Sequence, residues 1–136
     1  MSETPRHAPG QAVQHDVAPF AAWLGLEAVE VGSGRVVLQM NPRPEILNRR
    51  GVVHGGALAT LLDSAMARAS RTLEGVTELA GTTDLHVQFM RPAIGPLRTE
   101  AWVEHAGGTL AFCRGEVRDA EGRMVAAGSA SMRLRR

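Results

Sequence analysis

The chain has one cysteine, no tyrosine and no lysine, and it contains no long apolar run. The single Cys113 can form no disulfide within the chain. The residues up to Gly10 include no apolar segment of the kind found in secretory signals. No run approaches the ~18–20 apolar residues needed to cross a bilayer. We therefore expect a cytoplasmic protein without a membrane partner.

An excess of either charge is also missing, because 15 basic and 14 acidic residues give a formal net charge of +1. A nucleic-acid-binding domain of this size normally has a clear basic excess. The histidines and the cysteine, at positions 7, 15, 54, 86, 105 and 113, show no spacing typical of a metal site. The sequence thus predicts neither a nucleic-acid partner nor a bound metal.

What is present is the composition of one globular domain: 136 residues, 44% hydrophobic and 21% charged. Residues 1–15 are polar, contain two prolines and show no hydrophobic periodicity. We interpret them as a flexible N-terminal tail. Residues 16–136 are then expected to form a single domain, in which Asp16 is a candidate cap for a short helix that ends at Gly25.

One long helix is expected from about Gly55 to Leu73. Its apolar residues recur at the spacing of a buried helical face, namely Leu58, Leu61, Leu62, Ala65, Met66, Ala69 and Leu73. A neighbouring face carries small side chains and one carboxylate, Asp63, so a second segment is expected to cover that face as well.

Six strands are expected from alternating hydrophobicity between glycine and proline turns, at residues 26–31, 35–40, 82–90, 97–105, 109–118 and 124–134. Residues 41–48 hold two prolines and are expected to be loop. Two strands, one helix and four strands joined by short turns indicate an α+β fold. A single apolar helix is buried only if a curved antiparallel sheet wraps around it; the strand order does not follow from the pattern.

The strongest candidate site is the stretch from Asn48 to Gly56, which leads directly into the helix. A helix N-terminus offers free backbone N–H groups and a positive dipole end. Gly55 and Gly56 would let a ligand approach that backbone and would suit a developing oxyanion. The same residues also fit a structural interpretation, in which the glycines form a tight turn and His54 caps the helix.

Asp63 is the second candidate, because it stands in mid-helix with no basic residue within four positions. If its face is covered, it is a buried carboxylate without a local partner. Such a group is costly and is more often functional than structural.

Two motifs together resemble a known family. Asn-x5-His-Gly-Gly-x6-Asp, from Asn48 to Asp63, precedes a strand reading Thr-Thr-Asp-Leu-His-Val-Gln-Phe-Met-Arg-Pro-Ala, from Thr82 to Ala93. This resembles the hotdog-fold acyl-CoA thioesterases of the phenylacetic-acid-degradation (PaaI-like) type. The resemblance runs from about Phe20 to Met132 and implies a hotdog fold that hydrolyses acyl-CoA or aryl-CoA esters to free acid and coenzyme A.

The resemblance also implies roles for single residues. Gly55 would donate its N–H to the thioester carbonyl, and Asp63 would attack the thioester or activate water. Supporting positions are Asn48, which would orient the reacting groups, His54, which would support the loop, and Thr82, which would lie beside the attacking water. The adjacent Thr83 is an alternative to Thr82, because the sequence fixes the first residue of the strand only to within a residue or two.

Substrate contacts are assigned to Gly56 and to Arg91, the latter for coenzyme A phosphates together with Arg49 or Arg50. Phe89 and Trp102 are expected either in an acyl pocket or in the core. No cofactor is expected, because a thioester is already activated and coenzyme A is part of the substrate. Neither the acyl group nor the pathway follows from the residues.

A distance argument concerns the assembly. Eight residues separate Gly55 from Asp63, and a helix rises ~1.5 Å per residue, so they lie roughly 12 Å apart along the axis. A carboxylate and an oxyanion donor that act on one thioester must each lie within about 3 Å of their own reacting atoms. Both residues can serve one site only if two chains share it. We therefore expect at least a homodimer, and the family implies a homotetramer.

Two other functions remain open. The same fold hosts hydratases and dehydratases, for which His54 would have to act on a carbon pair. A non-catalytic acyl-CoA binding module is the alternative from another class.

Overall fold

The computed structural model describes residues 18–136, and the predicted tail at 1–15 lies outside them, as does Asp16. The elements in chain order are α1 (Pro19–Leu24), β1 (Glu27–Gly32), β2 (Arg35–Met40), the short 3-10 helix η2 (Pro44–Ile46), α2 (Gly55–Arg71), β3 (Glu78–Phe89), β4 (Leu97–Ala106), β5 (Leu110–Asp119) and β6 (Met124–Arg135). The predicted α+β class and the order of the elements are confirmed.

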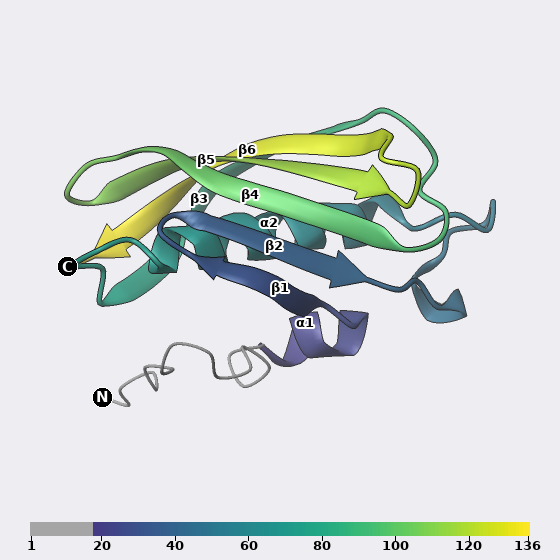
Figure 1. Ribbon diagram of the computed structural model, residues 1–136, viewed down its shortest axis with the longest axis horizontal. Helices are drawn as coiled ribbons and strands as arrows, with labels where there is room; N and C mark the ends of the chain where they lie inside the picture. Colours follow the sequence, from purple (N-terminus) through teal and green to yellow (C-terminus); the bar gives the residue numbers. More distant parts are fainter. Residues whose placement is uncertain (1–17) are drawn as a thin grey trace.

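All six strands form one antiparallel sheet in the order β1-β2-β4-β5-β6-β3. Figure 1 shows α2 along the inner side of this curved sheet. After β2 the chain passes through α2 and joins the opposite edge, where β3 pairs with the last strand, β6. This crossover leaves β3 as an edge strand beside the helix.

The core lies between α2 and the sheet, and the predicted apolar face of the helix is buried there. A pair of glycines on neighbouring strands, Gly115 and Gly128, lets the helix approach. A Cβ at Gly115 would lie 2.9 Å from the Leu62 side chain, and one at Gly128 would lie 2.9 Å from the carbonyl oxygen of His86. A larger residue at Gly115 would therefore push against the helix, and one at Gly128 would clash first with the backbone of β3.

Four predicted details are corrected. The N-cap of α1 is Ala18 rather than Asp16, because Pro19 occupies the first turn and no side chain caps it. Residues 41–48 are not all loop, since η2 forms within them. The strand predicted from Thr82 begins at Glu78, because its pairing with β6 continues to Arg135. Helix α2 ends at Arg71, two residues early, where the Thr72 hydroxyl donates to the Ala69 carbonyl.

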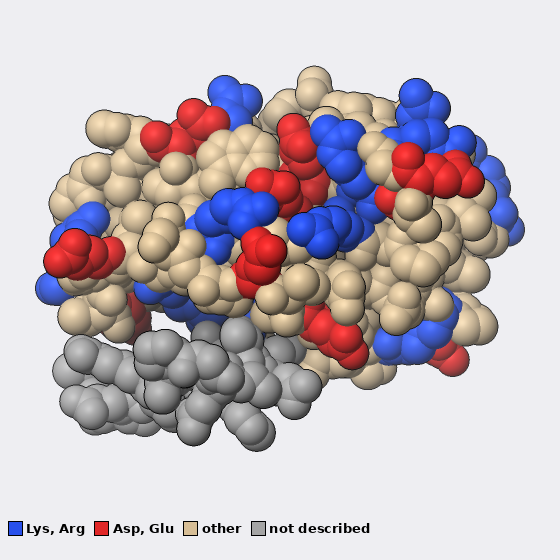
Figure 2. All heavy atoms as spheres, in the orientation of Figure 1, with Lys and Arg blue, Asp and Glu red and all other residues tan. Residues whose placement is uncertain are grey.

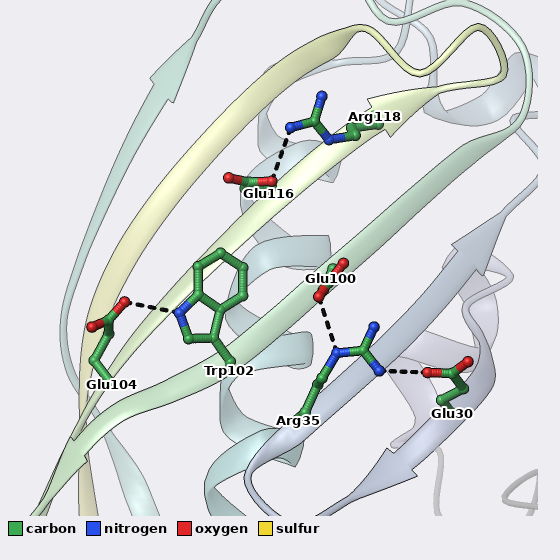
Figure 3. A network of polar contacts seen from close by, with 7 residues as sticks. All are labelled: Glu30, Arg35, Glu100, Trp102, Glu104, Glu116 and Arg118. Atoms are coloured by element: carbon green, nitrogen blue, oxygen red, sulfur yellow. Dashed lines mark hydrogen bonds and ion pairs between the residues drawn. The ribbon is translucent and has the colours of Figure 1, made fainter.

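The outer face of the sheet, which points away from α2, is charged. Figure 3 shows Arg35 between Glu30 and Glu100, and Trp102 donating from Nε1 to Glu104. On the face seen in Figure 2, basic and acidic side chains interleave rather than separate into patches. Exposed pairs of this kind contribute little stability. This face offers no single-sign surface for nucleic acid.

Candidate active site

The start of α2 is built around His54, which is the N-cap residue. Its ring Nδ1 accepts a hydrogen bond of 2.8 Å from the Gly56 N–H. Its own N–H donates to the Ile46 carbonyl over 2.8 Å and fixes the entry of the chain. The structural interpretation of His54 as a cap is therefore correct.

Gly55 is the first residue of α2, and its N–H has no acceptor among residues 18–136. The N–H of Gly56 is occupied by the His54 ring. The two glycines thus differ in what they offer to a ligand, since only Gly55 presents a free donor at the positive end of the helix dipole. Beside it lies the Phe89 ring, which would be 3.4 Å from a Cβ at Gly55.

Asn48 closes the turn that precedes the helix. Its side-chain Oδ1 accepts from the backbone N–H of Arg50 at 2.9 Å and of Val52 at 3.4 Å. Gly51 completes the turn at φ +75°, a conformation that favours glycine. The side-chain oxygen of Asn48 is thus used within the loop.

Asp63 lies half-buried on α2, and its partner comes from the edge strand β3 rather than from the helix. The Thr82 hydroxyl donates to Asp63 Oδ1 over 2.6 Å. The adjacent Thr83 hydroxyl donates instead to the Ser131 carbonyl over 3.2 Å. The choice between the two threonines therefore falls on Thr82. The sequence predicts a buried carboxylate without a local partner if its face is covered; Asp63 is half-buried, and the partner that it has comes from a distant element, β3.

Asp63 also lines a cavity of about 160 Å³ between α1 and α2. The remaining lining residues are Ala18, Ala21, Leu26, Leu38, Ser64, Ala67, Arg68 and Arg71. Sequence reasoning missed the two arginines as site residues. At 3.6 residues per turn, Arg71 at i+8 lies about 80° and Arg68 at i+5 about 140° around the helix from Asp63, so helical spacing gave no signal that they line one cavity.

A larger cavity of about 340 Å³ lies next to the turn made by Asn48. Its lining includes Gly51 and Val53 from that loop and the segment from Ala93 to Pro96. The Val53 N–H donates to the Ala93 carbonyl over 3.0 Å, which holds the two loops together. The structure thus brings the segment that follows Arg91 beside the loop that carries Arg49 and Arg50.

Three arginines and two aromatic residues complete the set of candidates from the sequence. Arg91, like Arg49 and Arg50, is exposed. Trp102 lies on the outer face of the sheet, so it can belong neither to an acyl pocket beside α2 nor to the core there. Phe89 is 56% exposed and is not a core residue.

Cys113 is a buried core residue, with its Sγ 3.1 Å from the Ser70 hydroxyl. Burial raises the pKa of the Cys113 thiol, against a weaker opposing effect of that contact. It therefore has no access to a substrate and little thiolate character.

Within residues 18–136, no cluster of three or more His, Cys, Asp or Glu side chains is arranged to hold a metal ion. Over the same residues, neither α1 nor α2 is long and apolar enough to cross a membrane.

Comparison with known proteins gives consistent matches. A family model described as thioesterase superfamily matches residues 50–126. A protein of Halobacterium salinarum, named provisionally as an esterase, is 32% identical over 124 residues, which cover 83% of this chain and 82% of that protein.

Solved structures agree with that match. A conserved protein of Pseudomonas aeruginosa superposes with a TM-score of 0.83 at 28% identity, covering 90% of this chain and 98% of its own. A mutant of the phenylacetic acid degradation protein PaaI from Thermus thermophilus superposes with a TM-score of 0.78 at 29% identity, covering 88% and 100%. The hotdog fold and the PaaI-like resemblance expected from the sequence are confirmed.

Proposed function

Because this chain belongs to the thioesterase superfamily, we propose that it hydrolyses acyl-CoA or aryl-CoA thioesters to a free acid and coenzyme A. The observation that carries the proposal is the 2.6 Å hydrogen bond from Thr82 to Asp63 across α2 and β3. It holds a carboxylate beside a cavity, in the same chain that offers a free backbone donor at the start of α2.

Asp63 is the acid of the proposed reaction. The Thr82 hydroxyl engages Oδ1, which orients the carboxylate and leaves Oδ2 for the reacting centre. In one route Oδ2 takes a proton from water while the water oxygen adds to the thioester carbon. In the other route Oδ2 itself adds to that carbon and forms an anhydride that water then cleaves. In both routes the C–S bond breaks and coenzyme A leaves as the thiolate.

Gly55 is the proposed oxyanion donor. Its N–H is free and lies at the positive end of the helix dipole, where negative charge on the carbonyl oxygen is stabilised. Gly56 cannot share this task, because its N–H is bonded to the His54 ring. Its contribution is the absence of a side chain, which keeps the approach to the helix open.

We propose that two chains share each site. The roughly 12 Å of helix between Gly55 and Asp63 separates donor and acid within one chain. The exposed edge strand β3 supports pairing with a second copy, because two of its own apolar residues are exposed, Leu85 at 39% and Phe89 at 56%. Across a two-fold axis, Gly55 of one chain would lie level with Asp63 of the other. A homodimer is then the minimal active unit, and a homotetramer stays a prediction.

Coenzyme A would lie toward the loops before α2 and after β3. Arg91, Arg49 and Arg50 are exposed cations on these adjoining segments and can bind phosphate groups. The proposed chemistry needs no metal and no redox cofactor, because a carboxylate and an N–H donor suffice for an activated ester.

The hydratase alternative is less well supported by the site. A hydratase would use His54 as an acid or base, yet Nδ1 of that ring is engaged in capping α2. A passive acyl-CoA carrier would need no oriented carboxylate, which makes the contact between Asp63 and Thr82 the feature that favours hydrolysis.

The test is release of free thiol from a panel of acyl-CoA and aryl-CoA esters. Wild type should turn over at least one ester, and Asp63→Asn should lose about 10²–10⁴ of the rate, as expected for removal of a general base. Glu116→Gln is the control, because Glu116 pairs with Arg118 on the outer face of the sheet, away from α2. Activity of Asp63→Asn within twofold of wild type would refute the assignment.

A further inference from the structure

The cavity beside Asp63 has two chemically different parts. Apolar side chains from α1, from the residues just after it and from β2, namely Ala21, Leu26 and Leu38, form one part of its lining. Arg68 and Arg71, the two arginines missed in the sequence, form another. Among the charged residues that line it, cations outnumber anions by two to one.

The spacing of these charges along α2 gives the cavity a direction. At ~1.5 Å per residue, Arg68 lies about 7.5 Å and Arg71 about 12 Å beyond Asp63 along the helix axis. A substrate whose reacting carbon meets Asp63 would therefore extend its acyl group toward guanidinium groups. Arg68 is only 7% exposed, so the cation itself is largely removed from water.

Both arginines take part in other interactions within the chain. Binding of a further group does not require either to be free, because a guanidinium carries five N–H donors. Its planar fork binds a carboxylate with two parallel hydrogen bonds.

Resting on the proposed thioesterase function, we propose that the substrate is a short-chain acyl-CoA whose acyl group ends in a second carboxylate. The methylene groups would contact the apolar lining, and the terminal carboxylate would bind Arg68 and Arg71. A volume of about 160 Å³ holds only a short acyl group, since it is well below the ~300–1,000 Å³ of pockets for drug-sized ligands. A neutral chain of the same length would have no terminal group to accept hydrogen bonds from the two guanidinium groups.

The first experiment compares kcat/KM for glutaryl-CoA with that for hexanoyl-CoA, which has a similar length but no terminal charge. Hydrogen bonds to a charged group support a preference for glutaryl-CoA of roughly ten- to a hundredfold. Arg71→Gln should lower this preference by about tenfold, and Arg68→Lys should lower it less, because it keeps the charge and loses the fork. Arg114→Gln on the outer face of the sheet is the matched control and should keep the ratio.

The outcomes separate this inference from the function on which it rests. Turnover of both esters with equal kcat/KM overturns the inference and leaves the thioesterase intact, as does a preference that survives in Arg71→Gln and Arg68→Lys alike. If neither ester nor any other is hydrolysed, the proposed function fails. The Kd values of the same two esters, measured by calorimetry, then decide the matter, and equal values overturn the carboxylate site.

Discussion

Replacing Gly55 with proline removes one N–H group from the site with little other change. Gly55 is the first residue of α2, where proline is well tolerated because the N–H has no partner within the helix. The residue before a proline must be extended, and His54 already has φ −58° and ψ 136°. Gly55→Pro should therefore fold with an unbroken α2.

The matched control is Gly55→Ala, which adds a side chain at the same place and keeps the N–H. In both variants the new Cβ meets the Phe89 ring at about the 3.4 Å found for an ideal Cβ on this backbone. Phe89 is 56% exposed and can yield to that contact. The difference between the two variants therefore isolates the donor.

Loss of one oxyanion donor lowers kcat by about 10²–10³ in enzymes where it has been removed singly. We expect Gly55→Pro to fall below Gly55→Ala by that factor, with similar melting temperatures. The assay is thiol release under saturating acyl-CoA. Buried Cys113 should add little background to it. If the proline and alanine variants stay within threefold of each other, the Gly55 N–H is not the donor and the proposed role is wrong.

Three further outcomes are expected. Thr82→Val should lower kcat about tenfold or more through loss of a hydrogen bond to a charged group, while Thr83→Val, whose hydroxyl bonds only a backbone carbonyl, should keep its rate. Mixed dimers of Gly55→Pro and Asp63→Asn chains should regain up to about half of the wild-type rate in the same thiol assay, because one of their two shared sites is intact. If verified mixed dimers are as inactive as either parent, the chains do not share a site. Thr99→Val should raise the melting temperature by about 3 °C, because the buried Thr99 hydroxyl has no partner among the described residues. Its removal should raise the free energy of unfolding by about 1 kcal/mol. A lower melting temperature would indicate that the hydroxyl has a partner.

The helix and most strand limits could be predicted because they depend on local signals. The apolar spacing in α2 reports which side chains face the sheet, and Gly25, at φ +81°, ends α1 where the sequence placed a stop. Strand order depends instead on which edges meet after the chain has crossed α2. No residue in or near β3 indicates that this strand will pair with β6, whose paired residues lie 37 to 57 positions later in the chain.

The candidate site shows the same division between local and distant causes. The motif from Asn48 to Asp63 is contiguous, and its turn, cap and helix follow from residues a few positions apart. The sequence leaves the hydroxyl residue of the site open between Thr82 and Thr83, because the side on which each points depends on the pairing of β3 with β6. That pairing shifts register between Thr82 and Asp84. The shift, which no local pattern encodes, places Thr82 on the side of the helix.

His54 links the structural interpretation of the motif to the catalytic one. As a cap it satisfies one N–H of α2, and the N–H it engages is that of Gly56. A cap and an anion site normally compete for the same free N–H groups at a helix start. Here the cap takes the N–H of the second residue and leaves that of the first, so under the proposed function the cap formed by His54 would direct a substrate carbonyl to Gly55.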